Sequence, residues 1–154
     1  MSINYGKKFE ERFKQDWINS TGGIVIRLYD NTSGYLSISN ISDYICYKYP
    51  NIFFIECKSH RGASIPFENI SQYKKLITLS NTLGVRCGVV LWLYEKDRVL
   101  YIPATTIRSL IDKGEKSVGL RHLEEERIIE IPSKKLRVFM ESDYSVLLSL
   151  QEGD

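Results

Sequence analysis

The sequence contains no long hydrophobic run. None of its apolar stretches approaches the ~20 residues that a helix needs to span a membrane, and its N-terminus lacks the apolar stretch of a signal peptide. Internal repeats and low-complexity tracts are also missing. We therefore expect a protein with no membrane partner that stays in the cytoplasm.

Cysteine is scarce as well. The three residues, Cys46, Cys57 and Cys87, are odd in number and lack the C-x-x-C spacing of a zinc site. All three lie in apolar, β-prone segments, so we expect them to be buried, reduced thiols.

The chain has little excess charge of either sign, with a formal net charge of +2. Residues 1–75 hold ten Lys or Arg against seven Asp or Glu, whereas the remainder holds eleven against twelve. An imbalance of this size is usually just a solvated face. It nevertheless makes the N-terminal half the better candidate for a surface that faces phosphates.

The composition that remains is that of an ordinary globular protein, 43% hydrophobic and 26% charged. A chain of 154 residues is long enough to bury a single core without a second domain. We therefore expect residues 1–154 to form one domain.

Hydrophobic spacing predicts the order of helices and strands. Phe9, Phe13 and Trp17 recur at i, i+4 and i+8, which predicts a first helix over 5–19 whose apolar stripe packs in the core. Residues 85–94 are nearly all apolar and predict a central strand covered on both faces. The other predicted elements are strands over 24–29, 44–47, 52–58, 98–102 (an edge strand) and 127–131, helices over 67–83, 103–112 and 143–151, a loop over 59–66, and a short strand or loop over 35–38. This order indicates an α/β fold with a central mixed β-sheet flanked by helices.

The most informative polar residues lie between positions 42 and 58. Residues 49–51, Tyr-Pro-Asn, separate two β-prone runs, so the runs can fold back antiparallel and bring Asp43 near Glu56. Alternation along the second run places Phe54, Glu56 and Lys58 on one face. Two carboxylates and a lysine are therefore expected at one spot.

Such a group suits metal-dependent hydrolysis of phosphodiesters. Mg²⁺ prefers oxygen ligands and keeps several waters, so Asp43 and Glu56 suffice to hold it together with substrate phosphate oxygens. The metal polarises the phosphoryl oxygen, and the Lys58 ammonium neutralises charge in the transition state.

Further residues, in the right order, resemble the PD-(D/E)xK nuclease superfamily: an acidic residue on the first helix, an aspartate step, an E-x-K strand and a polar residue on the next helix. Within it, the segments from residue 4 to residue 90 resemble RecU-type Holliday junction resolvases and their phage relatives. The matching segments are Asn4-x-Gly6-Lys7-x-Phe9-Glu10, Ser42-Asp43-Tyr44, Glu56-Cys57-Lys58, the loop 62–67 and Gln72. The resemblance implies a restriction-endonuclease-like core. It also implies a protein that works in a bacterial or phage-infected host cell.

The resemblance also implies a role for each matching residue at the metal. Asp43 and Glu56 correspond to the principal Mg²⁺ ligands, and Mn²⁺ is expected to substitute. Glu10 corresponds to the helix carboxylate that reaches the metal directly or through water, and the carbonyl of Cys57 to a further ligand.

Lys58 corresponds to the catalytic lysine and Gln72 to the polar helix residue that supports the site. The implied partners are branched DNA, above all the four-way junction, and a second copy of the chain in a homodimer. The residues expected to contact DNA are Arg27, Lys7, Lys8, His60 and Arg61.

Two departures from the family pattern stand out. Ser42 replaces the proline of the name motif, at a position that shapes the turn and provides no ligand. The segment 30–40 is short and polar, whereas the RecU family projects a stalk from this region into the junction centre.

Other interpretations remain open at this point. An isolated E-x-K is usually a solvated pair and Asp43 alone would cap a turn, although unpaired charges are costly on a strand as apolar as this one. Arg27 and Gln72 also fit as solvent-facing residues, and Tyr35 and Tyr44 either pack or face DNA. The alternative functions are a restriction or repair nuclease of the same superfamily and a non-catalytic DNA-binding accessory protein of recombination.

Overall fold

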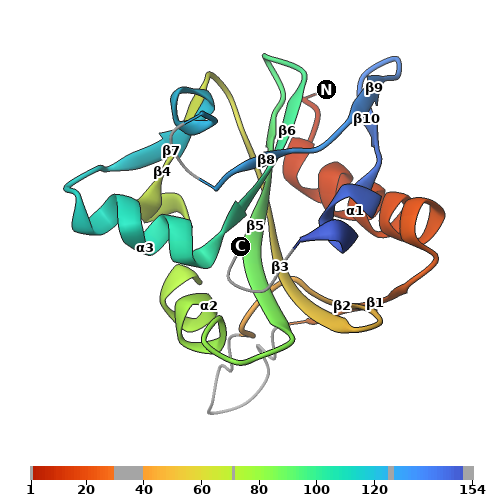
Figure 1. The fold of residues 1–154 in the computed structure, drawn as a ribbon. Coiled ribbons are helices and arrows are strands. Elements are labelled where there is room, and N and C mark those ends of the chain that lie inside the picture. Colours follow the sequence, from red (N-terminus) through yellow and green to blue (C-terminus); the bar gives the residue numbers. More distant parts are fainter. Residues whose placement is uncertain (1, 30–39, 71, 125–126, 151–154) are drawn as a thin grey trace, which may run out of the picture.

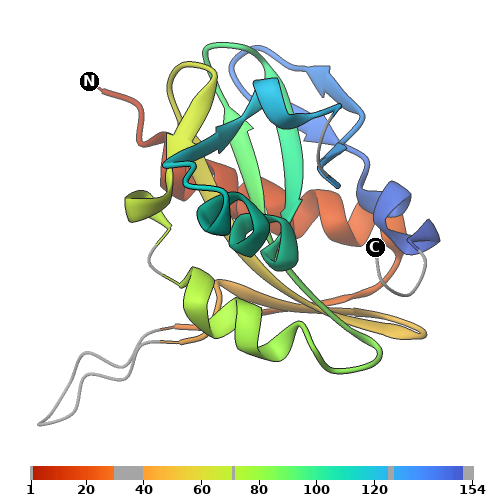
Figure 2. The ribbon, with the colours of Figure 1, turned by 60° about the vertical axis from the view of Figure 1, so that its left-hand side comes forward.

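A six-stranded mixed sheet runs through the middle of the computed structural model, which describes residues 2–29, 40–70, 72–124 and 127–150. Helix α1 (Tyr5–Thr21) covers one face of the sheet, and helices α2 (Tyr73–Leu79) and α3 (Ala104–Asp112) lie on the other side (Figures 1 and 2). The sheet strands, in spatial order, are β1 (Ile24–Arg27), β2 (Tyr44–Lys48), β3 (Asn51–His60), β5 (Val85–Leu93), β6 (Arg98–Pro103) and β8 (Ile129–Glu130).

Strand pairing follows the chain closely except at the centre. β3 and β5 run parallel, because α2 carries the chain from the end of one to the start of the other. All other neighbours in the sheet are antiparallel. Two small two-stranded antiparallel sheets accompany the central sheet: β4 (Ser64–Pro66) with β7 (Ser117–Gly119), and β9 (Ser133–Lys135) with β10 (Met140–Ser142).

Helix α1 begins where the sequence predicts and runs two residues beyond the predicted end, from Tyr5 to Thr21. Asn4 caps it, with its side-chain oxygen accepting a hydrogen bond from Lys7 N at 3.1 Å. The helix ends at Gly22, whose φ of 67° is in the left-handed region. Phe9, Phe13 and Trp17 are all buried, which confirms the predicted apolar stripe.

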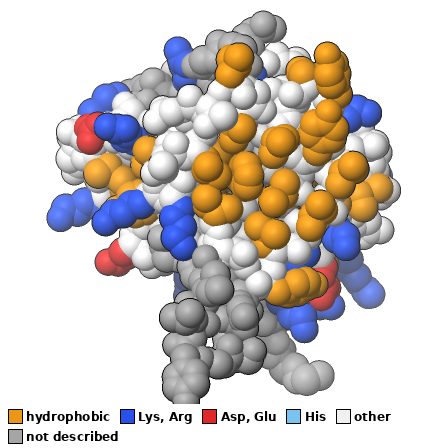
Figure 3. Space-filling view, turned by 90° about the horizontal axis from the view of Figure 1, so that it is seen from below, with side chains coloured by type: hydrophobic (Ala, Val, Ile, Leu, Met, Phe, Trp, Pro, Cys, Tyr) orange, Lys and Arg blue, Asp and Glu red, His pale blue; other side chains and the backbone are white. Residues whose placement is uncertain are grey.

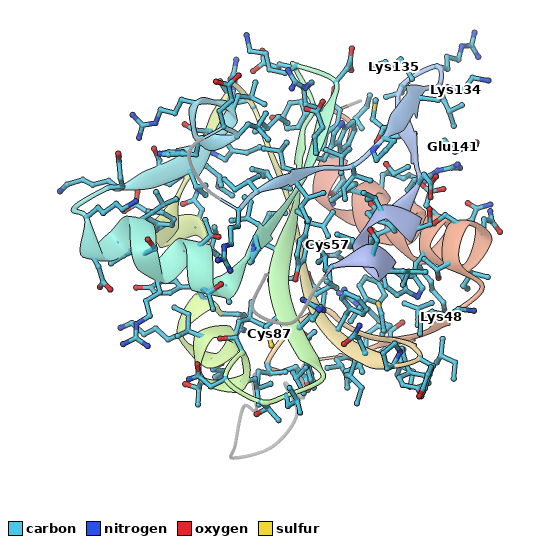
Figure 4. The ribbon with its side chains drawn as sticks, viewed as in Figure 1. Lys48, Cys57, Cys87, Lys134, Lys135 and Glu141 are labelled. Atoms are coloured by element: carbon cyan, nitrogen blue, oxygen red, sulfur yellow. The ribbon has the colours of Figure 1, made fainter. Side chains whose placement is uncertain are left out.

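The core is divided by the sheet into two layers. One layer joins α1 to β2, β3 and β5, and the other joins α2 and α3 to β5 and β6. Cys57 on β3 belongs to the first layer and Cys87 on β5 to the second, both well inside the molecule in Figure 4. All three cysteines are free and buried, as predicted.

Several predicted boundaries are wrong. The helix expected over 67–83 is a 3-10 turn (Phe67–Asn69) followed by the much shorter α2. The chain leaves the helical region at Ile70 (φ −114°, ψ 74°), because this fully buried side chain anchors the segment in the core. The helix expected over 143–151 is a 3-10 helix, Tyr144–Ser149, that begins at the Asp143 cap; residue 151 lies outside the described chain.

Long-range pairing explains the remaining differences. The predicted loop 59–66 instead contains the end of β3, which pairs with β5 as far as His60, and strand β4. The predicted edge strand 98–102 is internal, because β8 pairs with its outer side over two residues. The predicted strand 127–131 is present as the shorter β8, while segment 35–38 lies outside the described residues.

The central strand is confirmed, since β5 is buried from Cys87 to Leu93. Among the described residues, no helix is both long enough and apolar enough to span a membrane.

Candidate active site

Asp43 immediately precedes β2, at the end of this strand that pairs with the middle of β3. Tyr44 is opposite Ile55, which places Asp43 beside Glu56 and Cys57. One carboxylate oxygen of Asp43, Oδ2, accepts a hydrogen bond from the backbone N–H of Cys57 at 2.8 Å. The hairpin therefore brings Asp43 to the E-x-K strand and fixes its orientation there.

Glu56 and Lys58 project from the same face of β3. Lys58 Nζ is 3.5 Å from Glu56 Oε1, and the Glu56 residue is only 6% exposed. Burial, reinforced by the negative charge of Asp43, raises the pKa of Glu56 to about 7, although Lys58 opposes the rise. Near neutral pH, the neutral and charged forms of Glu56 are therefore similarly populated.

Glu10 joins this group through Arg27. Arg27, at the end of β1, places Nη2 3.0 Å from Glu10 Oε2 and Nη1 3.3 Å from Asp43 Oδ1. Burial lowers the pKa of Arg27, but the two carboxylates outweigh burial and leave its pKa above the ordinary value. The guanidinium is therefore the cation that joins α1 to the hairpin.

Two tyrosines frame the Arg27 guanidinium. Its central carbon is 5.1 Å from the ring centroid of Tyr44 and 5.6 Å from that of Tyr29, within the range of cation–π attraction. Nη1 is buried and, despite its closeness to Asp43, has no hydrogen bond of good geometry among the described residues. Arg27 is thus held by its ion pair with Glu10, by the charge of Asp43 and by the two aromatic rings.

Tyr44 also fixes the position of Glu10 along the helix. Its hydroxyl donates a hydrogen bond to the backbone carbonyl of Glu10 at 2.7 Å. Burial and the nearby Asp43 raise the pKa of the Glu10 carboxyl, while Arg27 and Lys58 lower it in part. Tyr44 itself is buried, so the open alternative that it faces DNA is wrong and its packing role is confirmed.

The donor set of this group suits a hard divalent cation. In the described ranges, no group of three or more His, Cys, Asp or Glu side chains is arranged so that it could hold a metal ion. The carboxylates are paired instead with Arg27 and Lys58. Two cations do not fully compensate three carboxylates, because Asp43 still raises the pKa of both Glu10 and Glu56. Mutually repelling carboxylate oxygens are the donors that Mg²⁺ prefers, so these residues fit it.

A cleft of about 470 Å³ opens beside the group. Glu10 and Arg27 lie in its wall together with two lysines of α1, Lys7 and Lys14. Lys14 was not among the residues predicted to contact DNA. It follows Lys7 by seven residues, a helical spacing that places both lysines on one side of α1, so the sequence pattern could have indicated it. Glu11 also lines the cleft, so its wall carries three cationic and two acidic side chains.

The other predicted site residues occupy different surroundings. Gln72 is half-buried at the N-cap of α2, on the element that follows the site strand. Lys8 is exposed and lies 3.8 Å from Glu11, on the surface of α1. Tyr35, named as an alternative DNA contact, lies outside the described residues.

His60 and Arg61 lie at the far end of β3. His60 Nδ1 is 2.7 Å from the backbone oxygen of Arg61, and Arg61 Nε is 3.3 Å from Glu95 Oε1. Arg61 is thus paired with a carboxylate on the β5–β6 turn. His60 and Arg61 lie outside the group of site residues. The structure brings together Glu10, Arg27, Asp43, Glu56, Cys57 and Lys58.

Comparison of the sequence with known families gives no match, and comparison with curated protein sequences gives none either. Comparison of the structure does give matches. The chain is similar to Hjc, a Holliday junction resolvase of the archaeal hyperthermophile Archaeoglobus fulgidus, with a TM-score of 0.58 and 15% sequence identity over 79% of this chain and 93% of Hjc. At this identity the likeness concerns the fold, and it confirms the predicted restriction-endonuclease-like core with its mixed sheet and flanking helices.

Proposed function

We propose that this chain is a Mg²⁺-dependent endodeoxyribonuclease that cuts four-way DNA junctions, a resolvase of the RecU type. The observation that carries the proposal is the convergence of Glu10, Asp43, Glu56 and Lys58 at one point of the β2–β3 hairpin. The similarity of the fold to that of a resolvase supports it.

The carboxylates of Asp43 and Glu56 and the carbonyl of Cys57 would hold Mg²⁺, with Glu10 as a direct or water-mediated ligand and Mn²⁺ as a substitute. When bound, the ion polarises the scissile phosphate and lowers the pKa of a coordinated water. The Cys57 N–H fixes Asp43 so that its other oxygen, Oδ1, is directed at the Arg27 side of the group. This preorganisation keeps the carboxylates in place before any ligand arrives.

Lys58 supplies positive charge on the same strand face as Glu56. An ammonium at this position orients the attacking water and neutralises negative charge that develops on the phosphate. Gln72, at the start of α2, supports the arrangement from the neighbouring element.

The cleft lined by lysines of α1 would provide the approach for DNA. Lys7 and Lys14 line it next to Glu10 and Arg27, and lysine contacts with phosphates position a duplex without reading its sequence. Arg27 is available to a phosphate once a metal ion takes over its carboxylate partners. A homodimer would supply the two equivalent sites that symmetric incision of a junction requires.

Cleavage of a labelled four-way junction in Mg²⁺ tests the proposal. We expect paired nicks in opposing strands and much slower cutting of a linear duplex with the same sequence. Lys58→Ala should lower the cleavage rate at least ~100-fold while junction binding persists, whereas Lys96→Ala, at an exposed turn lysine, should leave the rate unchanged. Equal cutting of duplex and junction would indicate a restriction or repair nuclease, and no cutting with full DNA binding would indicate an accessory protein.

A further inference from the structure

Strand β5 extends beyond the end of its neighbour β6. The two strands pair only from Gly88 onward, because the chain leaves the sheet at Pro103 and enters α3. Among the described strands, residues 85–87 of β5 therefore have a partner on one side alone, which is β3. A cavity of about 230 Å³ lies at this end of β5, lined by residues 80–87, Tyr101, Pro103 and Thr105. We call this cavity the β5 notch.

The β5 notch is lined by one charged side chain, that of Arg86. Its Nη2 donates a hydrogen bond to the backbone carbonyl of Leu150 at 2.9 Å, while its Nε is buried and has no hydrogen-bond partner among the described residues. Arg12 and Arg27 are half-buried like Arg86, but each of them pairs with a carboxylate. A half-buried guanidinium that meets only a backbone carbonyl keeps its charge uncompensated, and this favours a bound anion.

Tyr101 offers a second donor to the same cavity. The residue is only 2% exposed, yet within the described ranges its hydroxyl makes no hydrogen bond, although buried tyrosines usually find a partner. The ring lies across Gly88, where a Cβ atom would be 2.6 Å from Cε2 of Tyr101. Burial raises the pKa of Tyr101, and the positive charge of Arg86 offsets this only in part. The hydroxyl therefore keeps its proton near neutral pH and can donate it to an anion.

Helix α3 begins at the wall of the β5 notch. Its N-cap residue, Pro103, accepts no hydrogen bond through its side chain, and the first turn of the helix contains no acidic residue. The first amide groups of a helix have no acceptor within it, and together with the helix dipole they favour an anion. Because Pro103 and Thr105 line the notch, the uncapped start of α3 and the Arg86 guanidinium border the same cavity.

The surface next to the β5 notch is apolar. Gly84 in its wall accepts a hydrogen bond from Ile52 N at 2.9 Å, which joins the notch to the first strands of the sheet. The outer side of these strands carries apolar cross-strand rows: Ile24, Tyr47 and Ile52, then Ile26, Ile45 and Phe54. Figure 3 shows hydrophobic side chains gathered on this face, with Lys and Arg side chains at its margin. An anion in the notch would thus meet one cation and no carboxylate in its wall.

We propose that the β5 notch binds a small tetrahedral oxyanion of the phosphate class. The guanidinium of Arg86, the hydroxyl of Tyr101 and the amide groups of α3 approach from different elements, and a tetrahedral anion presents acceptor oxygens in several directions. The volume of about 230 Å³ is below the ~300–1,000 Å³ of pockets for drug-sized ligands, so it suits a phosphate ion or a terminal phosphate group. None of the candidate active-site residues lines the notch, and the proposal does not rest on the nuclease function.

Titration calorimetry of the full chain with inorganic phosphate, in chelator, tests the proposal. Arg86→Gln removes the charge and should lower the affinity for phosphate at least ~10-fold, the loss of a charge-assisted hydrogen bond. Tyr101→Phe removes only the hydroxyl, keeps the ring over Gly88 and should lower this affinity ~3–10-fold. Arg98→Gln is the matched control, because Arg98 lies at the opposite end of β6 from the notch, and it should bind phosphate as the wild type does.

A 5′-phosphorylated dinucleotide, titrated in the same way, distinguishes the two sources of such a group. Tighter binding of this probe than of inorganic phosphate, lost in Arg86→Gln, would identify the terminal phosphate of a nucleic acid as the ligand. Weaker binding would identify the free ion, and either result supports the site. If the wild type binds neither probe, or if both Arg86→Gln and Tyr101→Phe bind as the wild type does, the proposal is overturned. Circular dichroism should show that the variants are folded, and Tyr101→Phe decides the test if Arg86→Gln is not.

Discussion

The side chains of Arg27 and Asp43 form an ion pair at 3.3 Å, and the same guanidinium lies 3.0 Å from Glu10. Arg27 comes from β1 and Glu10 from α1, and Asp43 immediately precedes β2. Arg27 therefore occupies, with its own positive charge, the region between two carboxylates that the proposed function assigns to a metal ion. Under that proposal, this internal cation would stabilise the group and compete with a divalent ion for it.

Replacing this cation should shift the balance toward metal. Arg27→Gln leaves Glu10 and Asp43 without their counter-charge, so the free energy of unfolding in chelator should fall by about 1–2 kcal/mol. The rise in melting temperature on adding Mn²⁺ should be larger in the variant than in the wild type, because no guanidinium competes. Differential scanning calorimetry with and without Mn²⁺ measures both effects.

Arg12→Gln is the control for this prediction. Arg12 Nη2 lies 3.0 Å from Asp16 on the same helix, away from Glu10. It should lower stability without changing the response to Mn²⁺. A weaker response to Mn²⁺ in Arg27→Gln would mean that Arg27 assists the metal rather than competing with it.

The raised pKa of Glu56 should make stability depend on pH. The folded protein retains the Glu56 proton up to about pH 7, whereas an unfolded chain releases it near pH 4.5. The folded state therefore binds more protons in this interval, and the free energy of unfolding should fall by about 3 kcal/mol as pH rises from 4.5 through 7.

Glu56→Gln should remove this slope. Its stability relative to the wild type should increase between pH 4 and pH 8, as measured by denaturant unfolding in chelator. Glu11→Gln, at an exposed carboxylate on α1, should follow the wild type at every pH. Parallel profiles for wild type and Glu56→Gln would show that Glu56 titrates normally.

The hydrogen bond from Cys57 N–H to Asp43 separates two roles of this aspartate. Asp43→Asn keeps an acceptor oxygen but loses the charge, so stability should change by less than about 1 kcal/mol while Mn²⁺ affinity falls at least ~10-fold. Asp43→Ala should lose the same affinity and a further ~1–3 kcal/mol of stability, because the Cys57 N–H is left unpaired. Titration calorimetry and thermal unfolding measure the two effects separately; unchanged Mn²⁺ affinity in Asp43→Asn would remove Asp43 from the ligand set.

The local part of this structure could be predicted from the sequence. Alternation along β3 fixes Glu56 and Lys58 on one face whatever surrounds them, and the stripe of Phe9, Phe13 and Trp17 fixes the buried side of α1. The interruption of the helix expected over 67–83 could not be predicted from the apolar spacing. A buried Ile70 at the end of a short 3-10 helix produces the same apolar spacing as a continuous helix.

Relationships between distant elements could not be predicted. The ion pairs of Arg27 depend on how α1 crosses the sheet, and strand β4 pairs with β7, whose sequence gives no strand signal on its own. The cross-strand rows of apolar residues on β1, β2 and β3 could likewise not be predicted, because only the fold defines the register of these strands.

The location of a bound metal tests the central claim most directly. Anomalous diffraction from a crystal soaked in Mn²⁺ should show a single strong peak, or two adjacent peaks, within about 2.5 Å of carboxylate oxygens of both Asp43 and Glu56, with Arg27 withdrawn from Asp43. Manganese bound only elsewhere, or no manganese while Arg27 and Lys58 keep their carboxylate partners, would contradict the assignment of this group as a metal-dependent nuclease site.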